Sequence, residues 1–308
     1  MDIRQLKYFV AIVDASSISK AAQALYIAQP SLSQQIAGLE EELKVKLLFR
    51  SSHGVKPTEA GRALYRHARQ LLRQMDQIRA EVKEGSGSES GTVAIGFPTT
   101  VAWVLARPLF SRVRRQYPGI KLQIFESISG YITELLANGR LDLAILFRDV
   151  EAGGTSQTPL FKEDLYLVGD AGMNLSTEAP VCQLEQLHGI PLVAPSTTSG
   201  LRKLIEKAFS RADIALNIVG DVDSLSTLIS IAESGDASTI LPLSALSGRD
   251  PLHVPAARKL EPAIGRTASL CSSDVLPSDS ATLAVRQTVV DLVAELKDSG
   301  CWPGIVLL

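Results

Sequence analysis

The sequence predicts an α/β protein with a small helical N-terminal domain, and three observations lead to this prediction. Everything before the Gly/Ser-rich segment Glu84–Gly91 has helical periodicity. Everything after it alternates apolar, strand-like runs with helical segments, which is typical of α/β folds. The length of 308 residues is enough for two or three domains with cores of their own. We therefore expect a winged helix-turn-helix, a long linker helix and a larger α/β body.

The composition is ordinary for a globular protein, with 45% hydrophobic and 21% charged residues. No apolar run approaches the ~20 residues of a membrane span, and the first residues lack the pattern of a signal peptide. The cysteines Cys182, Cys271 and Cys301 are far apart and odd in number. They predict neither a disulfide framework nor a metal site. We expect a cytoplasmic protein without a metal, a cofactor or a membrane partner.

The charge is unevenly distributed along the chain. Residues 1–84 contain 13 lysines and arginines against 9 aspartates and glutamates, while residues 85–308 contain 18 against 24. A basic N-terminal part joined to an acidic remainder indicates that the N-terminal part contacts nucleic acid. Differences of this size also occur in enzymes, so the charge alone does not decide the function.

Three short amphipathic helices are predicted in the first 43 residues. Ser16 and Ser17 offer a cap between the first two, and Pro30 is suited to the first turn of the third. The inward residues, at helical spacing, are Leu6, Phe9, Val10 and Val13, then Ile18, Ala21, Ala22 and Leu25, then Leu32, Ile36, Leu39 and Leu43. Two short helices joined by a tight turn and braced by another helix form a helix-turn-helix.

A hairpin and a long helix follow. Residues 47–58, "LLFRSSHGVKPT", place apolar pieces on both sides of a polar tip, which predicts a wing with Arg50 and Lys56 at its base. Thr58 is positioned to cap a helix over Glu59–Glu84, with Glu59 in its first turn. The helix carries a heptad seam of Leu64, Ala68, Leu71, Met75, Ile78 and Val82. The seam either packs on its own domain or forms a dimer; we favour the dimer, because the seam ends at a flexible linker.

The body of the chain predicts a βαβαβ unit and a second α/β region. The strands are expected at 92–97, 121–127 and 141–147, with helices at 101–116 and 130–139. The apolar third strand is typical of a buried parallel sheet. A second region begins at Asp164–Gly169, with strands "IPLVAP", "ALNIVGDV" and "STILP" and helices near 201–209 and 225–233. The strand "RTASLCSS" and a helix over 281–296 close the chain.

Ligand chemistry is expected where the strands end. The segments 97–100, 126–129, 146–148 and 194–200 are rich in hydroxyls and precede helices, which suits a small anion or polar metabolite. The alternative is that these serines and threonines only cap helices; four such segments favour a shared cleft. Asp142 is expected to make a structural hydrogen bond to a neighbouring loop. The sequence has no catalytic motif, so we expect that the protein is not an enzyme.

The outward face of the third helix is slim and uncharged. With its apolar residues inward, Pro30, Gln34, Ala37, Gly38 and Glu41 point outward, flanked by Ser31 and Ser33. Glutamine and serine can bond base edges, and the two small residues permit close approach. Phosphate affinity must come from nearby cations, namely Lys20, Arg50, Lys56, Arg4 and Arg62. Glu40–Glu42 would repel phosphates, so the N-terminal half of the helix should enter the groove.

These residues resemble the LysR-type transcriptional regulators. The motifs "SISKAAQAL", "AQPSLSQQIAGLEEEL", "LLFR" and "PTEAG" are similar to those of the family's DNA-binding domain, and "GRLDLAIL" and "EDLYLVG" extend the similarity to the body. The order and the hinge look closest to the nitrogen-assimilation-control type. The resemblance covers essentially the whole chain.

The resemblance implies four parts: a winged helix-turn-helix at 1–58, a dimerising helix at 59–84, a hinge at 85–91 and an effector domain at 92–308. The effector domain would have two lobes, like periplasmic binding proteins, with lobe I at 92–163 and 266–308 and lobe II at 164–265. The motif at 18–37 would read DNA. DNA contacts are expected at Lys20, Gln29, Pro30, Ser31, Ser33, Gln34, Gly38, Arg50 and Lys56, and effector contacts at Thr99, Thr100, Ser129, Phe147, Ser196 and Thr197.

The partners implied are double-stranded operator DNA, a small anionic or polar effector, and further copies of the chain in a dimer or tetramer. RNA polymerase is a further candidate partner. Some regulators of this type respond without a small ligand. The competing hypothesis is an α/β solute-binding or enzymatic protein whose N-terminal helices only oligomerise; the missing export signal counts against the solute-binding form.

Overall fold

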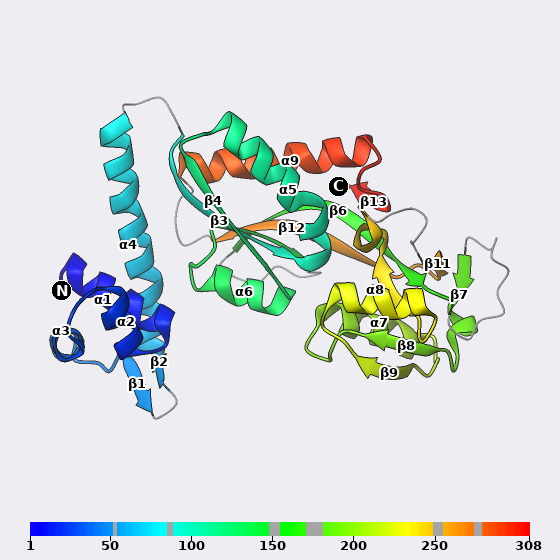
Figure 1. Cartoon of the computed structure of the whole chain (residues 1–308), viewed down its shortest axis with the longest axis horizontal. Coiled ribbons are helices and arrows are strands. Elements are labelled where there is room, and N and C mark those ends of the chain that lie inside the picture. The colour runs from blue at the N-terminus through cyan, green and yellow to red at the C-terminus, as the bar shows by residue number, and fades with distance from the viewer. Residues whose placement is uncertain (52–53, 85–88, 148–154, 171–180, 249–254, 274–278) are drawn as a thin grey trace. The chain divides into compact units, whose positions relative to one another are not determined.

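The structure, a computed structural model, describes residues 1–51, 54–84, 89–147, 155–170, 181–248, 255–273 and 279–308. The chain divides into two compact units, the first formed by Met1–Gly91 with Ala137–Arg140 and the second by the remainder. Figure 1 shows the elements of both units. Within the described ranges, no helix combines the length and the apolar character that crossing a membrane requires.

The N-terminal unit contains the elements that the sequence predicts. They are α1 (Ile3–Ala15), α2 (Ile18–Ala24), α3 (Gln29–Leu43), β1 (Leu48–Ser51), β2 (Gly54–Pro57) and α4 (Glu59–Glu84). The Ser17 hydroxyl caps α2 by accepting from the N–H of Lys20 at 3.3 Å, and Thr58 caps α4 by accepting from the N–H of Gly61 at 3.0 Å. Pro30 lies in the first turn of α3. The tip of the wing, residues 52–53, lies outside the described residues.

The helical spacing predicts the wrong burial for two residues, Val13 on α1 and Leu43 on α3. Ile12 is fully buried, whereas Val13 is only half-buried against the same core. Leu43 is 37% exposed, while Glu40 is 6% exposed and points inward. The reason is local: α3 ends at Leu43 and the chain turns away at Lys44 in a left-handed conformation. Leu32, Ile36 and Leu39 are buried as expected.

The heptad seam on α4 divides into two parts. Ala68 is fully buried in the core of the N-terminal unit, and Leu64 packs against that core, so the beginning of the seam serves its own domain. Leu71 and Ile78, further along, are 43% and 58% exposed. Met75 is half-buried, and the side chain of Val82 lies outside the described residues. Intradomain packing therefore explains the first turns of the seam and leaves Leu71 and Ile78 uncovered.

The second unit is built on a mixed sheet. Its first half contains β3 (Gly91–Pro98), α5 (Thr99–Gln116), β4 (Ile120–Ser127), α6 (Ser129–Ala137) and β5 (Leu143–Phe147), joined by β12 (Gly265–Ser273) and α9 (Ser280–Asp298). The strand order is β4-β3-β5-β12-β6-β11-β7. β3 and β5 are parallel, as predicted, but β12 is antiparallel to β5. The sheet is not purely parallel because β12, a strand from late in the chain, lies beside β5 in the opposite direction.

Two helical layers cover this half of the sheet, with α5 and α9 on one face and α6 on the other (Figure 1). Alternate residues of β3 divide between the faces: Val93, Ile95 and Phe97 join the core under α5 and α9, and Ala94 joins the core under α6. Asp142 is structural, as expected, but its partner is a strand. Its Oδ2 accepts from the N–H of Ala94 at 2.8 Å.

The long strand β6 (Thr155–Val168) connects the two halves. Its first part pairs with β12, and its last residues pair with β10 (Thr239–Pro242) and β11 (Ala257–Glu261). The predicted strand at Asp164–Gly169 is therefore the end of a longer one. The second half, with its own core, also contains β7 (Val181–Gln183), β8 (Pro191–Ala194), α7 (Gly200–Arg211), β9 (Asn217–Asp221), α8 (Leu225–Ser234) and the short helices η1 (Leu184–Leu187) and η2 (Leu243–Leu246). β13 (Ile305–Leu307) pairs with β6.

Candidate DNA interface and ligand cleft

The predicted reading face of α3 is largely exposed. Gln29, Pro30, Ser31, Gln34 and Gly38 are exposed, and Ser33 is half-buried. A Cβ atom built on Gly38 meets nothing within 4 Å. No packing within the domain therefore demands glycine at this position, although glycine weakens a helix.

The two helices of the motif are linked by a hydrogen bond between exposed side chains. The hydroxyl of Ser19 on α2 donates to Oε1 of Gln29, the first residue of α3, at 3.2 Å. This bond engages the amide oxygen of Gln29. The amide N–H groups of a glutamine are donors that match acceptors on base edges, such as the N7 and O6 of guanine.

Three exposed cations lie close to the motif in the sequence and on its wing. Lys20 is in the first turn of α2, and Arg50 and Lys56 are on β1 and β2. Arg50 pairs in register with Val55, and Lys56 with Phe49, so both lie in the middle of the wing strands and not at its base as predicted. Among the residues that the structure describes, none of the three cations has an ion-pair partner, so their charges are available to phosphates.

The glutamates at the end of α3 differ from the expected repulsive cluster. The Glu40 carboxylate accepts from the N–H groups of Leu47 at 2.8 Å and Leu48 at 3.2 Å and pairs with Lys46 at 3.1 Å. Burial opposes ionisation, but the hydrogen bonds outweigh it and lower the pKa of Glu40. Glu42 pairs with the amino group of Met1. The prediction for Glu40 is wrong: this residue attaches α3 to the wing.

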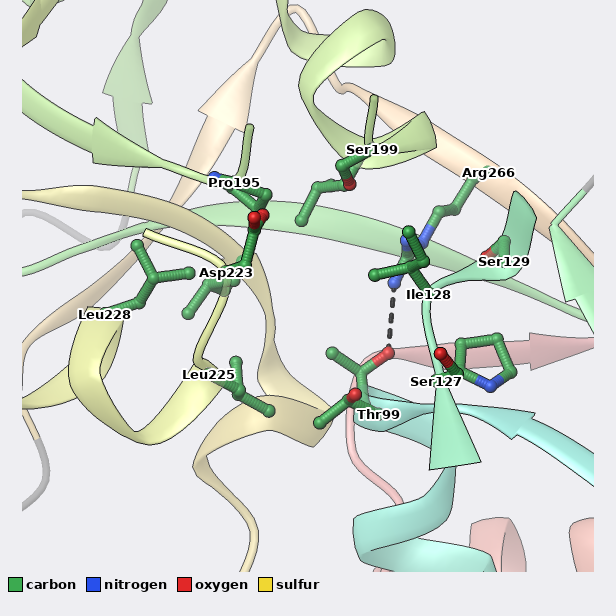
Figure 2. Close-up of a pocket in the computed structure, with 14 residues that line it drawn as sticks. Thr99, Ser127, Ile128, Ser129, Pro195, Ser199, Asp223, Leu225, Leu228 and Arg266 are labelled. Atoms are coloured by element: carbon green, nitrogen blue, oxygen red, sulfur yellow. Dashed lines mark hydrogen bonds between the residues drawn. The ribbon is translucent and has the colours of Figure 1, made fainter. Parts of the chain in front are cut away.

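A cavity of about 80 Å³ lies between the two halves of the second unit (Figure 2). One side is formed by residues at the ends of β3 and β4 and the starts of α5 and α6, and the other by residues after β8 and β9 and on α8. The lining residues are Pro98, Thr99, Thr100, Ser127, Ile128, Ser129, Pro195, Ser199, Leu201, Asp223, Leu225, Leu228, Leu241 and Arg266. Segments from three of the four predicted strand ends thus meet at one cavity.

Arg266 provides the positive charge among the described residues that line this cavity. Its Nε donates to Glu163 at 2.7 Å, a terminal nitrogen donates to the Thr100 hydroxyl at 3.2 Å, and its guanidinium lies 3.5 Å from the centre of the Phe147 ring. The negative charge on the lining belongs to Asp223, which accepts from the N–H of Ser196 at 2.9 Å. Because Glu163 already pairs with Arg266, the cavity carries no net positive charge.

The predicted effector residues divide into two groups. Thr99, Thr100 and Ser129 line the cavity. Phe147 and Ser196 do not line the cavity but contact residues that do: Phe147 lies against Arg266, and the N–H of Ser196 donates to Asp223. Thr197 is exposed and does not line the cavity. Sequence reasoning missed Arg266 and Asp223. Asp223 follows β9, so the strand-end rule could have found it, but a lone arginine at the beginning of a strand gives no signal. Arg148 lies outside the described residues.

The comparisons with known proteins agree with this architecture at both ends of the chain. Residues 3–62 match the model "Bacterial regulatory helix-turn-helix protein, lysR family", and residues 86–293 match the LysR substrate binding domain. The chain belongs to the LysR family. The nitrogen assimilation regulatory protein Nac of Escherichia coli is 40% identical over 249 residues, covering 80% of this chain and 79% of Nac. Nac of Klebsiella aerogenes is 39% identical over 246 residues, covering 80% and 79%.

A full-length OxyR variant from Pseudomonas aeruginosa has the same fold, with a TM-score of 0.74 and 23% identity, covering 95% of this chain and 94% of that one. This LysR-family chain is thus a DNA-binding transcriptional regulator with a two-lobed effector-binding domain, similar to the Nac subgroup. The family and the relatives are regulators and not enzymes.

Proposed function

We propose that this LysR-type regulator reads the major groove of its operator with the N-terminal half of α3. The exposed face of α3 carries this proposal: Gln29 and Gln34 supply directional hydrogen-bonding groups, while Gly38 adds no side chain. Lys20, Arg50 and Lys56 supply phosphate affinity without sequence preference. Pro30, Ser31 and Ser33 complete the contacting surface.

The proposed assembly is a homodimer joined through α4, with a homotetramer formed through the effector domains. Leu71 and Ile78 support the first contact, because they continue the heptad seam beyond the part that packs on its own domain. Trp103 and Phe110 of α5 support the second, because they are 38% and 47% exposed and lie seven residues apart on one face. The proposed domain boundaries are 1–58 for the winged helix-turn-helix, 59–84 for the dimerising helix, 85–91 for the hinge and 92–308 for the effector domain. Within the effector domain, lobe I comprises 92–163 and 266–308, and lobe II comprises 164–265.

The proposed effector site is the interlobe cavity, with Thr99, Thr100 and Ser129 as its hydroxyl groups. Of the two expected ligand types, a polar molecule fits better than an anion, because Asp223 would repel an anion and Glu163 already neutralises Arg266. The cavity of about 80 Å³ is also far smaller than typical ligand pockets of roughly 300–1,000 Å³.

The proposed setting is the cytoplasm, where the operator DNA lies, with RNA polymerase as the partner at the promoter. The name shared by the two Nac relatives makes genes of nitrogen assimilation the first targets to examine.

Selection from a random pool of double-stranded DNA tests the reading function. The full chain is incubated with the pool at about 0.15 M salt, close to physiological ionic strength, and bound fragments are sequenced over successive rounds. We expect enrichment of a motif with two-fold symmetry, because a dimer presents two copies of α3. Retention of DNA without any enriched motif would contradict the proposed reading face.

A further inference from the structure

The wing is attached to the rest of its domain through both of its strands. The carboxylate of Glu40 on α3 binds the backbone at the start of β1. On β2, the N–H of Val55 donates to the backbone carbonyl of Ser16 at 2.9 Å. Ser16 lies between α1 and α2, so the second strand of the wing is held by the turn that leads into the helix-turn-helix.

The carbonyl of Ser16 has a fixed direction because α1 ends at this residue. Ser16 is the C-cap of α1, with φ 49° and ψ 23°, a left-handed conformation that is uncommon for residues other than glycine. Its own N–H donates to the carbonyl of Val13 at 3.2 Å. The next residue, Ser17, caps α2 by accepting from the N–H of Lys20. One short turn therefore ends α1, begins α2 and binds the wing.

Gly54, the first residue of β2, is the position at which this contact leaves no room for a side chain. A Cβ atom built there would lie 2.7 Å from the carbonyl oxygen of Ser16, which is closer than Cβ atoms come in proteins. Its φ of +118° is also a conformation that other residues rarely adopt. Gly38 on α3, by contrast, has nothing within 4 Å. Both the space and the backbone conformation thus require glycine at position 54.

Val55 connects this contact to the cations of the wing. It is 8% exposed and belongs to the core of the N-terminal unit. Arg50 lies opposite Val55 in the register of the hairpin, and Lys56 follows Val55 directly. Both cations are exposed. The bond between Ser16 and Val55 therefore determines where the backbone that carries these two charges lies relative to the start of α2.

We propose that Gly54 is a positioning residue for DNA binding, which holds the wing against the turn between α1 and α2 by admitting the carbonyl of Ser16. Arg50 and Lys56 are thereby kept beside the first turn of α2, which carries Lys20. This inference rests on the proposed phosphate contacts of these cations. A side chain at position 54 should push the wing away from the turn. Because phosphate contacts carry no sequence information, affinity for every DNA should fall while the preference for the operator stays.

A double-mutant cycle on the full-length protein tests the proposal. Binding to random DNA is measured between about 0.05 and 0.2 M salt for the wild type, Gly54→Ala, Arg50→Ala/Lys56→Ala and the triple variant that combines them. Arg50→Ala/Lys56→Ala should reduce the salt slope by about 2, one for each phosphate contact, and Gly54→Ala should cause part of the same loss. Because Gly54 acts through the wing cations, the triple variant should bind no more weakly than Arg50→Ala/Lys56→Ala.

The outcomes separate this role from a general loss of stability. If Gly54→Ala only destabilised the domain, its effect would add to that of the other two substitutions, and such an additive loss would overturn the inference alone. A weaker preference for the operator, with an unaltered salt slope, would overturn it as well. If Arg50→Ala/Lys56→Ala bound DNA like the wild type, the proposed phosphate contacts of the wing would be wrong, and the inference would fall with them.

Gly235→Ala is the matched control. Gly235 ends α8 with a φ of +78°, but a Cβ atom built there meets nothing within 4 Å. The substitution therefore places alanine at a positive φ without a close contact, and it should leave the affinity for DNA and the salt slope unchanged. A loss as large as that of Gly54→Ala would show that the contact with Ser16 is not the cause.

Hydrogen exchange on the wild-type protein covers the case in which Gly54→Ala does not fold. The N–H of Val55 is bonded to a carbonyl outside the hairpin, so its protection from exchange reports whether the wing is held against the turn. We expect this N–H to be protected. Exchange at the rate of an unprotected amide would overturn the proposal.

Discussion

The carboxylate of Glu40 on α3 accepts a hydrogen bond from the backbone N–H of Leu47, next to the first strand of the wing, at 2.8 Å. A second bond, from the N–H of Leu48, and the pair with Lys46 complete the site. Two backbone donors at the start of β1 are thus satisfied by α3, the helix that we propose reads DNA. The position of the wing cations therefore depends on Glu40.

Glu40→Ala should destabilise the N-terminal domain by about 2–3 kcal/mol, because it removes charge-assisted hydrogen bonds and leaves two buried N–H groups without an acceptor. Urea unfolding followed by circular dichroism measures the loss. Glu41→Gln is the matched control, because Glu41 is exposed on the same helix, and it should change stability by less than about 0.5 kcal/mol. Equal stability of the two variants would show that Glu40 does not attach the wing.

Glu40 should also make this domain sensitive to acid. Its pKa is lowered in the folded protein from the ordinary value of 4.5. A lowered pKa stabilises the folded state above the unfolded pKa, and that stability is lost as the pH falls through the folded pKa. The stability difference between wild type and Glu40→Gln should be constant near neutral pH and shrink below pH 4.5. A difference that grows on acidification would contradict the direction of the shift.

Gly38→Ala should raise the stability of the protein and lower its affinity for the operator. Alanine favours a helix over glycine by about 1 kcal/mol, and open space receives the new methyl group, so the melting temperature should rise. Operator affinity, measured by fluorescence anisotropy, should fall because the methyl lies on the reading face. Gly130→Ala on α6, also without neighbours within 4 Å, is the control and should leave DNA affinity unchanged. Tight operator binding by Gly38→Ala would show that α3 does not approach DNA closely here.

Leu71→Asp should shift the assembly to smaller species, because a carboxylate in a heptad seam cannot be buried against a partner helix. Light scattering after size-exclusion chromatography gives the mass. Gln70→Asp adds the same charge next to the seam on α4 and should preserve the assembly. An unchanged mass for Leu71→Asp would assign the whole seam to packing within one chain.

The N-terminal domain was predictable from sequence because its signals are local. Helical spacing located α1 to α3, and Thr58 marked the beginning of α4 through a cap that the structure contains. The errors arose where tertiary contacts override spacing. Glu40 points inward because the chain after α3 supplies N–H donors to its carboxylate, and Leu43 is exposed because α3 ends there.

The ligand cleft was predictable only in part. Strand-end hydroxyls such as Thr99 and Ser129 follow a rule that holds within one sheet. The rule did not identify Arg266, because this residue lies on β12, a strand far along the chain that pairs with β6. Register between distant strands is not encoded in any local pattern, so the pair of Arg266 with Glu163 could be found only in the structure.

Comparing Gln34→Ala with Lys56→Ala on operator and random DNA over a range of salt concentrations tests the central claim most directly. Gln34→Ala should weaken operator binding by about 1–3 kcal/mol, the contribution of a bidentate base contact, and leave random DNA unaffected. Lys56→Ala should weaken both and reduce the salt slope by about 1, because it contacts phosphate. Equal loss on both DNAs for Gln34→Ala, with an altered salt slope, would contradict the account that α3 reads the sequence.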